Sequence, residues 1–380
     1  MTMFCVIMLV VPLLACGVAH ALRNSMSLGR LLAVVAASAA VTAASASIVS
    51  CSNVSDVETW NGRVAHKDRE RVDCTHSYQC NCRQECTTTA NKGQSCTQVC
   101  DTCYEHDYDV DWNVTTTNHE LVTIDRVDRQ GIHEPSRWAS VRIGDPTSMP
   151  HRYDNYVKGA PGTLFRHQGL AQRYLPVLPP HPEHYDYYRS DHLVTAGELA
   201  MSPEERAAWN SDLAELNSDL GSAKQANVIV VLVADMPDDF YYALEEAWVG
   251  GKKNDVILVA SVSASGDLRW ASVMCWTSNE LFRVALRDHV MFDERLDRRA
   301  VVKHLHEDVG GLFVRKPMKD FEYLQASIVP TADEWALCLI INLLVAGAVL
   351  IALHVDDPDG GRGPGWARAG VRRRRYSYEL

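Results

Sequence analysis

The sequence predicts a membrane-anchored α+β protein, in which a small cysteine-rich β domain precedes an α/β domain and transmembrane helices lie near both termini. Three observations on the 380-residue chain support this prediction. Long uncharged stretches lie near both termini. Seven cysteines lie within one short region, residues 74–103. Further along, two apolar runs rich in β-branched residues flank a helical segment, which is typical of a parallel βαβ unit.

Three uncharged stretches are about as long as a transmembrane helix: residues 2–22, 31–50 and 335–355. About 20 apolar residues are enough to cross a hydrocarbon core of roughly 30 Å. We expect membrane spans at 31–50 and 335–355. The stretch 2–22 is a candidate third span, and a translation start at Met26 would leave it out of the protein. An uncleaved anchor is the favoured interpretation of 31–50, and the alternatives are a cleaved signal peptide or a lipoprotein anchor at Cys51.

The basic residues predict an orientation in the membrane. Arg23 and Arg30 precede the second stretch, and the tail 356–380 carries a run of arginines. Basic flanks stay on the cytoplasmic side, so we expect residues 51–334 in the periplasm, outside an inner membrane, and the C-terminus in the cytoplasm. The net charge of −11 argues against a nucleic-acid partner. The expected partners are the lipid bilayer and another membrane or envelope protein.

Residues 51–145 are predicted to form the cysteine-rich β domain. A Trp60-Asn61-Gly62 turn signal precedes a polar strand pattern that ends near residue 71. The segments 109–117 and 120–128 alternate apolar and polar residues around Asn118-His119, which predicts a β-hairpin. Residues 146–200 follow, and their many Pro, Tyr and His residues predict an ordered linker without regular secondary structure.

Residues 201–325 are predicted to form the α/β domain. Ser202 is a good helix N-cap, Pro203 suits the first helical position, and we expect this helix to end at Gly221. Buried strands and covering helices follow. The strands are expected at 227–235, 255–262 and 268–276, and the helices at 238–249, 279–290 and 298–309.

The cysteines between residues 80 and 103 fit one antiparallel hairpin that turns at residues 90–93. Partner residue numbers in such a hairpin sum to a constant. Cys86 with Cys96 and Cys82 with Cys100 give the same sum, and the third pair, Cys80 with Cys103, fits after a one-residue bulge. Directly opposed residues lie close enough for a disulfide.

Two interpretations of these cysteines stay open. In an oxidising compartment the cluster, together with Cys51, supplies the even number that a disulfide framework requires. Its members are Cys74, Cys80, Cys82, Cys86, Cys96, Cys100 and Cys103. Alternatively, two close cysteine pairs form a four-thiolate zinc site, with His76 or His106 as substitute ligands. Its ligands would be Cys80, Cys82, Cys100 and Cys103, and zinc is the one cofactor that the sequence indicates.

Three acids are candidate catalytic residues at the end of the first buried strand: Asp235, Asp238 and Asp239. Ligands bind at the carboxyl edge of open α/β sheets, and carboxylates there can hold a divalent cation. The alternative is that they offset the dipole of the following helix. We expect a binding protein rather than an enzyme. A metal-dependent, phosphatase-like hydrolase and a zinc-stabilised structural scaffold are the alternative functions.

Several strings resemble a group of uncharacterised membrane proteins encoded by tailed bacteriophages and prophages. They include CTHSYQCNC (74–82), CDTCYEHDYDVDW (100–112) and EEAWVGGKKNDVIL (245–258). This resemblance covers nearly all of residues 53–355 and implies a phage protein that acts at the host envelope. Residues 227–290 more weakly resemble the TPM domain, an extracytoplasmic α/β module for which phosphatase activity has been proposed in plants. The Lys-Asp-Asn-Gly-type turn of that family is Lys252-Lys253-Asn254-Asp255 here.

Overall fold

The computed structural model describes most of the chain, in two compact units. The described residues are 2–23, 28–88, 94–163, 167, 169–328 and 330–355. One unit combines the two chain ends, up to Val54 and from Tyr323 onward, and the other is Ser55–Glu322. Three features of the sequence analysis lie outside the described residues: the basic tail 356–380, Met26 and the predicted hairpin turn at 90–93.

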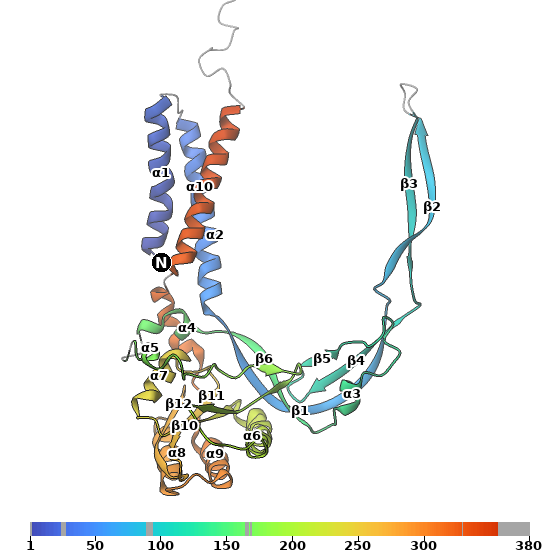
Figure 1. The fold of residues 1–380 in the computed structure, drawn as a ribbon. Helices are drawn as coiled ribbons and strands as arrows, with labels where there is room; N and C mark the ends of the chain where they lie inside the picture. Colours follow the sequence, from blue (N-terminus) through green and yellow to red (C-terminus); the bar gives the residue numbers. More distant parts are fainter. Residues whose placement is uncertain are drawn as a thin grey trace, which may run out of the picture. The chain divides into compact units, whose positions relative to one another are not determined.

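Three helices pack together in the first unit: α1 Thr2–Arg23, α2 Leu28–Val54 and α10 Ala332–Val355 (Figure 1). Two of them are long and apolar enough to cross a membrane, α2 over Leu31–Val54 and α10 over Ala332–Ala352. The apolar part of α1 that passes the same composition test is shorter, Met3–Leu14. All three uncharged stretches are therefore helical, as predicted.

A buried asparagine links all three helices of this bundle. Asn342 in α10 is fully buried, and its Nδ2 donates to the backbone oxygen of Met8 in α1 at 2.8 Å. The same Nδ2 lies 3.2 Å from the Oγ1 of Thr42 in α2, which also accepts from it. At the end of α2, Asn53 donates to Glu334 at 3.3 Å. Polar contacts therefore supplement apolar packing between these helices.

The first sheet of the second unit has the strand order β5-β4-β1-β6. Its strands are β1 Ser55–Val72, β4 Asp109–Thr116, β5 Leu121–Ile124 and β6 Pro146–Asp154. The first half of β1 pairs with β6 and its second half with β4, all antiparallel. The predicted hairpin of β4 and β5 is confirmed, and His119 in its turn has φ 64°.

The predicted turn at Trp60-Asn61-Gly62 is wrong, because all three residues lie inside β1. Gly62 is required there for a different reason. A Cβ at this position would come within 2.5 Å of the Oγ1 of Thr117. The glycine therefore permits close approach of a neighbouring segment, a common role for glycine within strands.

The second sheet has the order β12-β11-β10-β9, and helices cover both of its faces. Its strands are β9 Leu193–Ala196, β10 Asn227–Ala234, β11 Asp255–Val262 and β12 Leu268–Cys275. Strands β9, β10 and β11 are parallel, and β12 is antiparallel to β11. In β10, Val228 and Val230 pack with the helices of one face, whereas Ile229 and Val231 pack with α7 on the other. Burial on both faces explains why the sequence of this strand is continuously apolar.

The helices of this unit largely match their predicted positions. They are α6 Pro203–Lys224, α7 Asp239–Ala247, α8 Leu281–Phe292 and α9 Arg298–Leu312, with short helices α3 Ser136–Ser140, α4 Tyr156–Gly159, α5 Leu170–Tyr174 and η1 Pro161–Thr163. The 3-10 helix η2 Met318–Ser327 includes the boundary between the two units. The Oγ of Ser202 caps α6 by accepting from the backbone N–H of Glu205 at 3.1 Å. The predicted end of α6 at Gly221 is wrong, because the helix continues to Lys224.

The prediction of irregular structure for residues 146–200 is also wrong. This range contains β6, β9 and the short pair β7 His184–Tyr185 and β8 Arg189–Ser190. Two prolines, Pro146 and Pro150, lie inside β6. They are tolerated because β6 is an edge strand of its sheet, where a missing backbone N–H breaks no inner ladder.

Buried charges join β1 to the α/β part of the unit. The carboxylate of Glu58 is fully buried and accepts two hydrogen bonds from Arg315, at 2.8 and 3.0 Å. The Nζ of Lys252 donates to Asp56 at 2.6 Å, and Asn254 donates to the backbone oxygen of Thr59 at 2.6 Å. The turn at residues 252–255 therefore holds β1 in place through its side chains.

Candidate functional site: the cysteine hairpin and its base

The cysteine-rich region forms a long hairpin of two strands, β2 Ser77–Thr88 and β3 Gln94–Tyr104 (Figure 1). Three disulfides cross it: Cys80–Cys103, Cys82–Cys100 and Cys86–Cys96. The cross-strand pairs predicted from the sequence are confirmed. The register shifts between Cys80 and Arg83, where the bulge was needed, and Asn81 there has φ 48°.

The disulfides change two expectations about the cysteines. The four thiols of the zinc alternative are bonded to one another in two disulfides. The framework also uses six cysteines and not eight, since Cys51 and Cys74 are free among the described residues. Cys51 lies in α2, in the other unit, and Cys74 precedes β2, so neither faces a cysteine across the hairpin.

The hairpin has little core of its own. Residues 81–86 of β2 are all exposed, and Tyr78 and Tyr104 near its base are 52% and 58% exposed. An isolated two-stranded hairpin is at best marginally stable in water. Disulfides stabilise such an element mainly by restricting its unfolded state. The hairpin is therefore an exposed element that its disulfides stabilise in place of a hydrophobic core.

A second group of reactive side chains lies at the base of the hairpin. Two of them precede β2 and two follow β3: Cys74, His76, His106 and Asp109, called the base cluster below. One ligand atom from each lies within 4.8 Å of every other. The backbone N–H of Glu105 donates to the backbone oxygen of His76 at 3.0 Å and so holds the two segments together. The base cluster is thus built by the closure of the hairpin.

Asp109 is the buried and charged member of the base cluster. Burial acts to raise the pKa of its carboxyl group. Hydrogen bonds act in the opposite direction, chiefly that from Arg126 at 2.7 Å and with help from Cys74 and the backbone N–H of Thr75, and they lower the pKa to about 2. The carboxylate is therefore ionised at neutral pH.

The histidines of the base cluster face this carboxylate. The Nδ1 of His106 lies 3.2 Å from the Oδ1 of Asp109 and 3.7 Å from the Sγ of Cys74. The Nδ1 of His76 lies 3.4 Å from the Oδ2 of Asp109 and has no hydrogen-bond partner among the residues that the structure describes. Sequence reasoning identified Cys74, His76 and His106 near a metal site but missed Asp109. The signal was available in the Cys-x-His and His-x-x-Asp motifs on either side of the hairpin.

The three predicted catalytic acids lie at the carboxyl end of β10, where the sequence placed them. Asp239 accepts from Arg173 at 2.7 Å and from the hydroxyl of Tyr174, and Asp235 pairs with Arg269 at 3.4 Å. Among the described residues, only the base cluster gathers three or more ligand atoms within 4.8 Å. A cation site formed with Asp238 and its neighbours stays a prediction.

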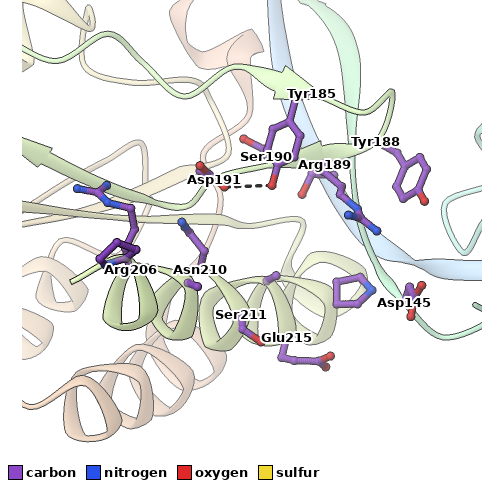
Figure 2. Close-up of a pocket in the computed structure, with 15 residues that line it drawn as sticks. Asp145, Tyr185, Tyr188, Arg189, Ser190, Asp191, Arg206, Asn210, Ser211 and Glu215 are labelled. Carbon is purple, nitrogen blue, oxygen red and sulfur yellow. Dashed lines mark hydrogen bonds between the residues drawn. The ribbon is translucent and has the colours of Figure 1, made fainter. Parts of the chain in front are cut away.

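A cleft of about 630 Å³ lies beside α6 (Figure 2). Arg206 and Asn210 of this helix face it, with Tyr185 and Arg189 opposite, and the Tyr185 hydroxyl donates to Asp191 at 3.1 Å. Much of its polar lining is already engaged. The Oδ1 of Asn210 accepts from two backbone N–H groups of the chain entering β9, and Arg206 donates to Thr195. These contacts fasten α6 to the edge of the second sheet.

Comparisons of this chain with models of protein families, with curated proteins and with solved structures found no match in any of the three. The hairpin, its base and the apolar helices are therefore the features that bear on function.

Proposed function

We propose that this chain is a bacteriophage-encoded integral membrane protein that binds an envelope protein of the host through its disulfide-crossed hairpin. In this proposal α2 and α10 anchor the chain in the inner membrane, and the unit 55–322 lies on the extracytoplasmic side. The observation that carries the proposal is the set of three disulfides across one exposed hairpin. Disulfides form and persist in oxidising compartments and are rare in the cytosol.

The hairpin supports a binding role because its strands are extended, rigid and open at both edges. Among the described strands, β2 and β3 pair only with each other, so each strand keeps one row of backbone groups for an added strand. Many protein partners bind by adding a strand to such an edge. The cross-links reduce the entropy lost on binding, because the hairpin is already ordered.

The first test concerns the compartment. Cells producing the full-length protein are treated with a thiol-blocking reagent, and the intact mass is measured before and after reduction. We expect the six hairpin cysteines to react only after reduction, and protease added to spheroplasts to digest the unit 55–322 while a C-terminal tag survives. Hairpin thiols that react without reduction, or a unit protected from protease, would rule out the extracytoplasmic location.

The second test concerns the partner surface. A photo-reactive amino acid is placed at Tyr78 or Tyr104 on the hairpin, and as a matched control at the exposed Tyr242 on α7. We expect one discrete cross-linked envelope protein from both hairpin positions and none from Tyr242. The same adducts from all three positions, or adducts from none, would show that the hairpin is not the binding element.

A further inference from the structure

The base cluster combines a thiol, two imidazoles and a carboxylate at one point, and we propose that it is a zinc site. Thiolate sulfur, imidazole nitrogen and carboxylate oxygen are the ligands that zinc takes in proteins, usually four at a time in structural sites. This donor set is unsuited to Mg²⁺ or Ca²⁺, which prefer oxygen atoms alone. The inference is independent of the proposed binding role and of the side of the membrane on which the unit lies.

Two distances within the base cluster match a tetrahedral centre. Bonds of about 2.0–2.3 Å to zinc place neighbouring ligand atoms roughly 3.3–3.6 Å apart. The Cys74 Sγ and His106 Nδ1 are 3.7 Å apart, and that same nitrogen is 3.2 Å from the Asp109 Oδ1. The remaining histidine, His76, directs its Nδ1 to within 3.4 Å of the carboxylate. Among the described residues that buried nitrogen has no hydrogen-bond partner, and binding a metal ion would satisfy it.

The arrangement does not suit a cysteine nucleophile activated by a histidine. In such a catalytic triad the imidazole contacts the nucleophile through one ring nitrogen and the acid through the other. Here the Cys74 sulfur and the Asp109 carboxylate both approach the same Nδ1 of His106. Atoms that converge on one point describe coordination better than a proton relay.

Neighbouring groups hold one of the ligands, Asp109, in orientation. Arg126 donates to the Oδ2 of Asp109 at 2.7 Å, and the backbone N–H of Thr75 lies 3.4 Å from the same oxygen, which leaves Oδ1 facing the histidine. The guanidinium also binds Asp111 at 2.7 Å, which offsets its charge beside a cation. Metal ligands commonly have such hydrogen-bonded supports.

A zinc ion here would cross-link the two chain segments at the base of the hairpin. It would join the segment that enters β2 to the segment that leaves β3, beyond the last disulfide at Cys80–Cys103. Four protein ligands leave no open coordination position, which is characteristic of a structural site. The ion would therefore fix the direction of the hairpin with respect to the first sheet.

The test uses the full-length protein in detergent, with zinc chloride or cobalt chloride as the only added probe. We expect about one tightly held zinc per chain, and with cobalt a tetrahedral spectrum that includes a thiolate charge-transfer band. Cys74→Ser and His106→Asn should each lower the retained zinc at least tenfold. Cys51→Ser and His66→Asn are the matched controls, because both side chains are exposed and lie outside the base cluster, and they should retain wild-type zinc.

Intact mass after alkylation shows whether each variant keeps its three disulfides, so loss of metal is separated from loss of the hairpin. If a variant fails to fold, the cobalt spectrum of the wild-type protein decides. A wild-type protein that retains no zinc, a cobalt complex without the thiolate band, or a Cys74→Ser variant that binds as well as the wild type would each overturn the proposal.

Discussion

At the scale of single residues, the buried histidine His192 makes the stability of the second unit sensitive to acid. Its side chain is 1% exposed, and burial, with a smaller effect of His184, lowers its pKa to about 4. In the unfolded chain a histidine has a pKa of about 6.5. The unfolded state therefore takes up a proton in a pH range where the folded state does not, and acid favours unfolding.

We predict that the free energy of unfolding falls as the pH is lowered from about 6.5 to about 4. His192 should account for a loss of roughly 3 kcal/mol. Above about pH 6.5 the imidazole of His192 is neutral in both the folded and the unfolded state, so the free energy of unfolding has its full value with respect to this group. His192→Gln keeps a polar group near the Oγ of Ser148, which lies 3.3 Å from Nε2, and should flatten this part of the profile. Denaturant titrations at several pH values measure it.

The exposed His66 on β1 provides the control, since His66→Gln should leave the profile unchanged. If the two variants show the same dependence on pH, other groups cause the acid sensitivity. Candidates are the buried Asp56 and Asp255: burial acts to raise the pKa of each carboxyl group, and hydrogen bonds, chiefly from Lys252 to Asp56 and from His181 to Asp255, lower it. Their contribution is present at neutral pH and is lost at lower pH, as they take up protons.

Residues that act locally were predictable from the sequence, and residues that act over long distances were not. The cap at Ser202 depends on a hydrogen bond three residues away, and the disulfides follow from the symmetry of one hairpin. Asp109 was missed although it belongs to a His-x-x-Asp motif, because its role depends on the closure of the chain that brings it to Cys74. The catalytic role assigned to Asp235 and its neighbours remains a hypothesis.

At the scale of secondary structure elements, helix α6 shows how packing overrides a local rule. Glycine often ends a helix, but α6 continues through Gly221 to Lys224, and Gln225 with φ 52° follows it. A Cβ on Gly221 would lie 2.2 Å from the backbone oxygen of Asn61 in β1. Gly221 is therefore needed because the backbones of α6 and β1 approach each other too closely there for a side chain.

We predict that Gly221→Ala destabilises the protein by about 1–3 kcal/mol or more, because the added methyl group must push α6 away from β1. Gly310→Ala in α9 is the matched control, since the nearest atom to its new Cβ would be 3.9 Å away. That change should be neutral or stabilising by up to about 1 kcal/mol, as alanine favours helices over glycine. Thermal and denaturant unfolding compare the two, and equal effects would contradict the proposed contact.

Elements with a strong apolar pattern were predictable, and elements without one were not. The strands β10 and β11 are buried on both faces, so their sequences are unmistakably apolar. The edge strands β6 and β9 were missed in the proline-rich range, because an edge strand has fewer pairing requirements and tolerates proline. Because edge strands accept proline, a rule that treats proline-rich segments as irregular will miss them.

At the scale of the whole molecule, the chain ends form a unit of their own. Asn342 and Met8 are 334 positions apart in the sequence and are joined by a hydrogen bond. Hydropathy predicted each helix separately, yet it gives no information about which helices associate. Between apolar helices in lipid, association depends on close packing and on polar contacts such as this one.

We predict that Asn342→Leu loosens the three-helix bundle without unfolding its helices. Hydrogen bonds between membrane helices contribute about 0.6 kcal/mol on average and up to about 1.7 kcal/mol, which corresponds to a roughly 3- to 20-fold change in an opening equilibrium. The reporter is the buried thiol of Cys338, which packs with Phe4 and Val49 of the other two helices. Its alkylation rate in mild detergent should rise by that factor.

Leu344→Ala is the control, because Leu344 is 67% exposed on the same helix and contributes little to the interior of the bundle. It should leave the alkylation rate of Cys338 unchanged. If Asn342→Leu also leaves it unchanged while circular dichroism shows intact helices, apolar packing alone holds the bundle. The buried amide would then have to be explained by another role, such as fixing the relative rotation of α1, α2 and α10.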